Sequence, residues 1–106
     1  MQPFPLSIRF EDQSDGALLR LDGEIDLSSA HLLVERIDEA IGRGALRVIL
    51  DFGGVTFVNS TGLGAMVAAT KRLRADGGDL VLRSFRGIPA SALATTGLDR
   101  FFTIES

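Results

Sequence analysis

The sequence predicts an α/β fold: a small mixed β-sheet of four to five strands, mostly parallel with an antiparallel first strand, packed with three to four helices. Short apolar runs alternate with segments of helical periodicity in the order β-β-α-β-α-β-α-β. A polar turn joins the first two strands and favours antiparallel pairing, whereas a helix separates each later pair and favours parallel pairing. The chain of 106 residues suits a single domain, residues 1–106, around one core.

The composition excludes several classes of function. A net charge of −3, with no basic stripe, argues against nucleic acid as a partner. The chain has no Cys and no signal-like N-terminus, and both observations fit a cytoplasmic protein. Residues 52–70 are uncharged, but nine of these nineteen are Gly, Asn, Ser or Thr. Such residues are expensive in lipid, so we expect no direct membrane insertion.

The first two strands are predicted from alternation. Residues 6–10 alternate apolar and polar side chains, and the polar turn of residues 11–16 leads into a second strand. This strand places the carboxylates of Asp22, Glu24 and Asp26 on one face. Without a His or Cys to complete a transition-metal set, a solvated strand face is the favoured interpretation, and we expect no metal. Asp26 lies at the carboxyl end of the strand, where open α/β sheets gather their sites.

The next segment has helical periodicity up to Gly42 and Gly44. Ser28 is predicted to cap this helix, with Leu27 and Leu32 as the two partners of a hydrophobic staple. His31 is the only histidine of the chain, and its place in the first turn indicates a surface residue rather than a ligand or a base.

The chain is organised around residues 46–78. Residues 48–50 form an uninterrupted apolar run, which is typical of a strand buried on both faces. Gly53-Gly54 predicts a turn, residues 55–58 a short apolar segment, and Asn59-Ser60-Thr61 the start of a helix that ends before Gly77-Gly78. One side of this helix has almost no side chain, because it carries Gly64, Ala65, Ala68 and Ala69.

The hydroxyls of Ser60 and Thr61 are predicted to lie at the helix N-terminus. The free N–H groups and the positive end of the dipole would favour an added phosphate there by roughly 0.3–1 kcal/mol. The small face leaves room for another backbone to approach. Together these features indicate a switch rather than a catalytic site.

The last third of the chain predicts a short strand, a short helix and a final strand. Residues 80–82 are apolar, and Pro89 stands near a helix start. Gly97 is placed as the glycine that follows the helix, with Leu98 able to contact Leu93 in a Schellman arrangement. Residues 101–104 supply the closing apolar segment.

Motifs of the common catalytic and cofactor-binding classes do not fit. Gly62-Leu63-Gly64 supplies two glycines of a dinucleotide fingerprint, but Val67 stands where the third is needed. The Gly-Lys-Ser/Thr of a phosphate loop is absent, and Ser60 lacks the flanking glycines of a nucleophile elbow. With one His and no Cys, we expect no enzyme activity and no cofactor.

Three segments resemble a known family. Residues 51–64, DFGGVTFVNSTGLG, resemble the signature of STAS domains, the fold shared by sulfate transporter tails and anti-sigma factor antagonists. Residues 23–27 (GEIDL) are similar to the family's second strand and the start of its first helix, and residues 96–101 (TGLDRF) to the end of its third helix. The free-standing length favours the bacterial antagonist branch.

The resemblance implies a phosphoprotein that regulates transcription by partner switching. An antagonist of this branch binds an anti-sigma factor that is also a serine kinase, which frees the sigma factor. The kinase inactivates it by phosphorylating the first hydroxyl residue of the motif, here Ser60 with Thr61 as the alternative, and a PP2C-type phosphatase reverses this. Asn59 stands where family members commonly carry Asp; it keeps the cap and removes a charge beside the acceptor.

Partner binding is expected to involve residues near this helix start and on its small face: Asp26, Ser28, Asn59, Ser60, Thr61, Gly62, Leu63, Gly64, Ala65 and Ala68. The oligomeric state does not follow from the sequence. Two other functions stay open: the STAS subunit of a bacterial lipid-transport ABC complex, and a small nucleotide-binding domain. Ser60 and Thr61 also fit plain helix caps, and the small face fits packing against a neighbouring element.

Overall fold

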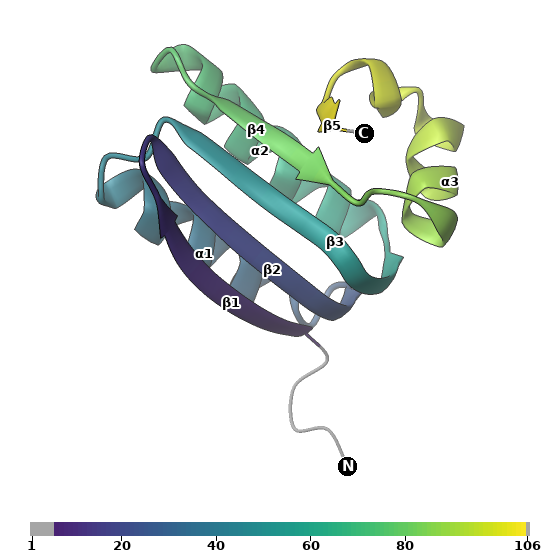
Figure 1. Cartoon of the computed structure of the whole chain (residues 1–106). Coiled ribbons are helices and arrows are strands. Elements are labelled where there is room, and N and C mark those ends of the chain that lie inside the picture. Colours follow the sequence, from purple (N-terminus) through teal and green to yellow (C-terminus); the bar gives the residue numbers. More distant parts are fainter. Residues whose placement is uncertain (1–5, 106) are drawn as a thin grey trace.

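The computed structural model describes residues 6–105 and shows a five-stranded sheet with helices packed against it (Figure 1). The elements in chain order are β1 (Leu6–Gln13), β2 (Gly16–Ile25), α1 (Ala30–Gly42), β3 (Arg47–Val58), α2 (Ser60–Ala75), β4 (Asp79–Arg83), α3 (Gly87–Thr96), the 3₁₀ helix η1 (Leu98–Arg100) and β5 (Thr103–Glu105).

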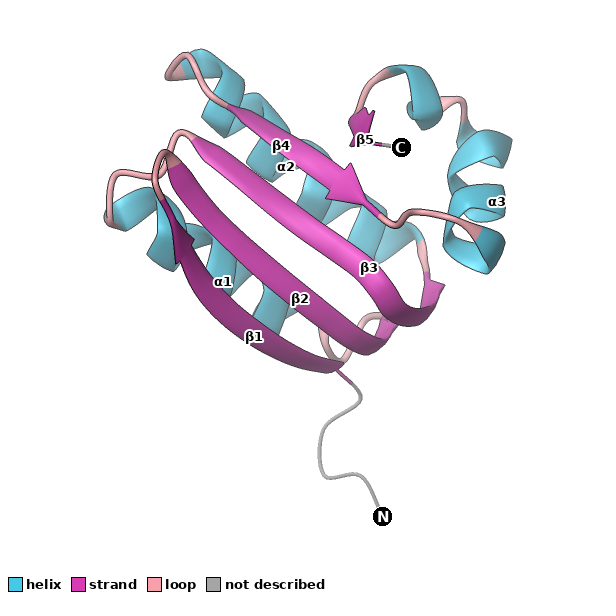
Figure 2. Ribbon diagram, viewed as in Figure 1, coloured by secondary structure: helices cyan, strands magenta, loops and turns pink. Residues whose placement is uncertain are grey.

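The strand order is β1-β2-β3-β4-β5, with β1 antiparallel to β2 and every later pair parallel. Helices α1 and α2 lie behind the sheet, and α3 stands beside the far end of β3 (Figure 2). The predicted fold class is therefore confirmed. None of the helices within residues 6–105 is long and apolar enough to cross a bilayer.

The main core lies between the sheet and the two helices behind it. Alternate strand residues such as Leu19, Leu50 and Leu82 point to this side and are fully buried. They belong to the same apolar cluster as Leu33 of α1 and Met66 of α2. The helical spacing that the sequence shows in these two segments is thus what closes the core.

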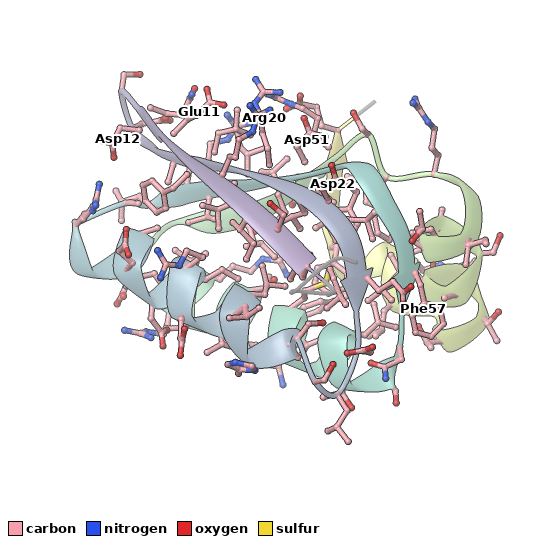
Figure 3. The ribbon with its side chains drawn as sticks, turned by 90° about the horizontal axis from the view of Figure 1, so that it is seen from below. Glu11, Asp12, Arg20, Asp22, Asp51 and Phe57 are labelled. Atoms are coloured by element: carbon pink, nitrogen blue, oxygen red, sulfur yellow. The ribbon has the colours of Figure 1, made fainter. Side chains whose placement is uncertain are left out.

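The other face of the sheet carries a row of charges of alternating sign. Strand register places Arg20 beside Asp51, Asp51 beside Arg83, and Arg83 beside Glu105. Glu11 extends the row by pairing with Arg20, and Figure 3 shows Glu11, Arg20 and Asp51 gathered on this face. The row continues beside a small buried apolar cluster of Leu18, Ile49 and Val81. These charges keep the helix-free face compatible with water.

The glycines after the helices do what the sequence predicts, with one variation. Gly44 has a φ of 91°, and the next N–H, of Ala45, donates to the Ala40 carbonyl at 3.0 Å, as in a Schellman motif. Gly97 has a φ of 76°, but the N–H of Leu98 donates to the hydroxyl of Thr96 at 3.3 Å. The Thr96 hydroxyl in turn donates to the Leu93 carbonyl at 2.7 Å. It therefore links Leu93 and Leu98, the two residues that the sequence predicts to be in contact.

The predicted turn at Gly53-Gly54 is wrong, because β3 continues through it to Val58. The register with β2 shifts by one residue between Arg20 and Asp22, which is a bulge on β3. The Asp51 carboxylate accepts the Gly53 N–H at 2.9 Å, and a Cβ on Gly54 would lie 2.8 Å from the Asp22 carboxyl carbon. The two glycines therefore serve a bulge and a close contact rather than a turn.

Candidate functional site

The predicted switch residues lie at the exposed start of α2. Asn59 has an extended backbone, and its side-chain oxygen accepts the Gly62 N–H at 3.1 Å, which is an N-cap. Ser60 and Thr61 are the first two residues of the helix, and both are exposed. A hydroxyl that another protein can reach thus stands where the helix dipole favours negative charge.

The start of α2 is attached to the end of β2. The Asn59 N–H donates to the Ile25 carbonyl at 3.0 Å. Gly62 is buried against the same residue, since a Cβ there would lie 2.6 Å from Ile25 Cγ2 and 3.0 Å from Val58 Cγ2. Ser60 is therefore held in a defined position relative to the turn that follows β2.

Asp26 organises that turn. Its Oδ1 accepts the N–H of Ser28 at 2.9 Å, the hydroxyl of Ser28 at 2.7 Å and the N–H of Ser29 at 3.2 Å. Ser29 is fully buried, and its hydroxyl donates to the Glu24 carbonyl at 2.8 Å. Asp26 and Ser28 therefore form one hydrogen-bonded unit at the carboxyl end of β2.

Two details of the predicted helix start are wrong. Helix α1 begins at Ala30 and is preceded by Ser29, not Ser28, and no serine side chain caps it. The Asp26 carboxylate binds the N–H groups of Ser28 and Ser29 instead, in the turn that precedes the helix. Leu27 is 78% exposed, so it forms no staple with Leu32. The Leu27 side chain is exposed to solvent instead.

Hydrogen bonds lower the pKa of Asp26 below its usual 3.8, and the largest contribution comes from the Ser28 hydroxyl. Burial, the second-largest effect, opposes this, and the Ser28 N–H and the hydroxyl and N–H of Ser29 add to the lowering. Because the folded pKa lies below the unfolded one, the ionised carboxylate stabilises the fold above about pH 4, and this contribution is lost as the pH falls through the folded pKa. In thermal melts of wild type and Asp26→Asn, we expect the wild-type advantage to be largest at neutral pH and to vanish in acid. A gap that widens in acid would contradict this assignment.

The predicted partner-binding residues divide by burial. Ser28, Ser60, Thr61, Gly64 and Ala68 are exposed, and Asp26, Asn59 and Ala65 are half-buried. Gly62 and Leu63 are buried, Leu63 with 4% of its surface exposed, because the first turn of α2 packs on the ends of β2 and β3. These two positions support the surface from beneath and are not part of it.

The small face of α2 is only partly free. Ala65, Ala68 and Ala69 share a shallow groove of about 140 Å³ with Val34 and Ile37 of α1. An ion pair between Arg72 and Asp38, at 2.7 Å, joins the two helices at the same place. Gly64 stays open, since a Cβ added there would meet no atom within 4 Å. Proximity to α1 thus accounts for the half-buried Ala65 and Ala69, but not for the exposed Ala68 and Gly64.

Replacing the cap should change the stability of α2 in a predictable order. Asn59→Ala removes the acceptor for the Gly62 N–H and is expected to cost about 1 kcal/mol of unfolding free energy. Asn59→Asp keeps the acceptor and adds a charge that the dipole favours, so it should be at least as stable as wild type. Urea denaturation of the three proteins measures this. Equal stability of Asn59→Ala and wild type would show that the cap contributes nothing.

Within residues 6–105, no three His, Asp or Glu side chains are grouped so that they could hold a metal ion. The carboxylates of Asp22, Glu24 and Asp26 therefore do not converge. The site offers an accessible hydroxyl, the positive end of a helix dipole and an adjoining turn held by hydrogen bonds.

A family model for the STAS domain matches residues 7–106. This match covers nearly the whole chain, so the chain belongs to the STAS domain family.

Relatives within this family include anti-sigma factor antagonists. RsfB of Mycobacterium tuberculosis, named an anti-sigma-F factor antagonist, is 30% identical over 67% of this chain and 58% of its own length. BtrV of Bordetella bronchiseptica is 33% identical over 67% of this chain and 62% of its own length. The chain thus spans about three-fifths of the length of these two curated relatives. The anti-sigma-B factor antagonist of Bacillus subtilis is 28% identical over 95% of this chain and 92% of its own length.

Solved structures show the same fold. An anti-sigma factor antagonist from Mycobacterium paratuberculosis superposes with a TM-score of 0.85 at 22% identity, covering 97% of this chain and 87% of that one. The antagonist SpoIIAA matches in its unphosphorylated form with a TM-score of 0.80 at 20% identity, covering 94% of this chain and 89% of SpoIIAA. Its phosphorylated form, from Bacillus, matches with a TM-score of 0.72 at 22% identity, over 94% and 92% of the two chains.

Proposed function

We propose that this protein is an anti-sigma factor antagonist, which binds an anti-sigma factor with serine-kinase activity in the cytoplasm and releases the sigma factor. Phosphorylation of Ser60 by that kinase ends the binding, and a PP2C-type phosphatase restores it. The observation that carries this proposal is the exposed Ser60 hydroxyl at the start of α2. The named relatives and the likeness to SpoIIAA support the class of function.

The physical basis of the switch is a charge added to a docking surface. A phosphoserine brings about −1.5 to −2 charges. The helix N-terminus tolerates them within the fold, because its free N–H groups and dipole favour an anion. In the complex the same charges would be taken out of water against a partner without a matching cation, which costs several kcal/mol. The fold therefore survives phosphorylation, whereas the complex does not.

This function needs no catalysis by the chain itself. A nucleophilic serine needs a neighbouring base, and the only histidine, His31, is exposed on the first turn of α1. Ser60 is the acceptor of a phosphoryl group that the partner transfers. In this role the hydroxyl needs access and a defined position.

The experiment is a competition assay with purified components. The protein is titrated into a complex of the source organism's serine-kinase anti-sigma factor and its sigma factor, and release of the sigma factor is followed by size-exclusion chromatography. Displacement of the sigma factor at micromolar protein supports the proposal. If the complex stays intact and the protein elutes alone, the proposal is wrong.

A second candidate follows from Asn59, which stands where the antagonist branch commonly carries Asp. Without that charge beside the acceptor, the domain also fits the STAS subunit of a bacterial lipid-transport ABC complex, which docks on an ATPase. Co-purification with the transport ATPase, together with no displacement of a sigma factor, would favour this role.

A further inference from the structure

Large apolar side chains are exposed at one end of this molecule. Six such side chains are substantially exposed within residues 6–105: Leu27, Val34, Leu46, Phe57, Ile88 and Ile104. Leu27 follows β2, Phe57 is the next-to-last residue of β3, and Ile88 lies in the first turn of α3, after β4. These three are 78%, 42% and 65% exposed. We name them the apolar edge.

The three residues lie at the same end of the sheet, because parallel strands have their carboxyl ends at a common edge. Phe57 pairs in register with Glu24, and Ile25 with Val58. Ile88 lines a cavity of about 230 Å³ together with Val55 and Thr56 of β3. Figure 3 shows Phe57 at the opposite end of the molecule from Asp12, which belongs to the hairpin end of β1.

The exposure of Leu27 is maintained by the structure around it. The hydrogen bonds of Asp26 and Ser29 hold the turn on both sides of this leucine. The Asn59 N–H then attaches the end of β2 to the start of α2 at 3.0 Å. A large apolar side chain is therefore exposed to water on a turn that these hydrogen bonds hold in place, and little backbone entropy is lost when a partner covers it.

We propose that the apolar edge supplies the anchor residues that dock the anti-sigma factor, with Leu27 and Ile88 as the principal contacts and an apolar patch on the partner as their complement. This rests on the proposed function and adds the chemistry of recognition. The end of β2, two residues before Leu27, is hydrogen-bonded to Asn59, the residue before Ser60. A partner that docks at this end of the sheet would therefore cover Ser60 as well. The binding energy then comes from apolar residues that become buried in the complex, and a phosphate on Ser60 prevents the complex from forming.

The test compares single alanine variants in binding to the source organism's anti-sigma factor by isothermal titration calorimetry. We expect Leu27→Ala and Ile88→Ala each to weaken the affinity tenfold or more, which is about 1.4 kcal/mol. Leu46→Ala removes a 51% exposed leucine at the amino end of β3 and is the matched control, expected within twofold of wild type. Leu27→Met keeps an apolar side chain and should bind within a few-fold of wild type.

Thermal melts of each variant check the fold, and a change in melting temperature is not expected, because both side chains are mostly exposed. If both alanine variants bind within twofold of wild type, the inference is overturned while the proposed function stands. If wild type binds no anti-sigma factor, the proposed function fails and the inference fails with it. If Leu27→Ala instead dissociates a dimer without changing the affinity for the anti-sigma factor, the edge holds a second copy, and the inference is also wrong.

Discussion

Replacing Ser60 by aspartate is expected to weaken the binding of the anti-sigma factor by roughly a hundredfold or more. The exposed hydroxyl would become a permanent charge on the proposed docking surface. Burying an unmatched charge in an interface costs several kcal/mol, and each 1.4 kcal/mol is a tenfold change in affinity. A phosphoserine carries a larger charge. If its burial costs about 4 kcal/mol of binding free energy, the affinity falls roughly a thousandfold.

Calorimetric titration of the anti-sigma factor with matched variants measures this effect. Ser60→Ala should bind as wild type does and resist inactivation by the kinase. Ser14→Asp places the same charge on an exposed turn at the other end of the sheet and should leave the affinity within twofold. If Ser60→Asp binds as tightly as wild type, and Ser60→Ala is regulated as before, Ser60 is a helix cap and not a switch.

Gly62 is expected to be the least replaceable glycine of the site. A Cβ there would lie 2.6 Å from Ile25 Cγ2, so Gly62→Ala must displace the start of α2 from the end of β2. Overpacking of this kind costs about 1–3 kcal/mol. The melting temperature should fall by roughly 4–8 °C for each kcal/mol in a domain of this size. Because Ser60 moves with the helix start, the affinity for the partner should fall as well.

Gly64→Ala on the same helix is the matched control. Gly64 is exposed and has nothing within 4 Å of the added Cβ. Alanine in an exposed helix is favoured over glycine by up to about 1 kcal/mol, so this variant should melt a few degrees above wild type. Differential scanning calorimetry compares the two. A Gly62→Ala protein as stable as Gly64→Ala would show that the contact with Ile25 relaxes freely.

The succession of strands and helices along the chain and the directions of the strands could be predicted from the sequence, because both follow from local patterns. The alternation in residues 6–10, the polar turn after it and the later segments of helical length are each read from a short window. Gly53-Gly54 could not be read in this way. Paired glycines suit a turn or a bulge equally well, and the choice depends on the register with β2, which is a tertiary contact.

The position of the candidate site could be predicted from the sequence, but which of its residues are exposed could not. The caps of Asn59-Ser60-Thr61 locate a helix start, which the structure confirms. Burial of Gly62 and Leu63, and exposure of Leu27, depend on how α2 packs against β2, and no local pattern states this. The DLSS segment after β2 contained one usable signal: an Asp two residues before a Ser suits a carboxylate that binds the following N–H groups, as Asp26 does.

The row of charges on the helix-free face shows that alternation predicts which face a residue occupies but not which residues it pairs with. Alternation along β2 places Arg20 and Asp22 on the exposed face, away from the buried Leu19 and Leu21. The partners of Arg20, which are Glu11 and Asp51, come from two other strands. Only the sheet register brings them together.

The role of Ser60 as the acceptor that controls docking is the central claim, and one measurement tests it directly. The protein is incubated with the source organism's anti-sigma factor kinase and ATP, the modified residue is located by mass spectrometry, and the phosphorylated protein is titrated against the same anti-sigma factor. We expect one phosphate, on Ser60, an unchanged circular dichroism spectrum and an affinity lowered about a thousandfold. Phosphate on Ser60 with unchanged affinity, or no phosphate on Ser60 at all, would contradict this role.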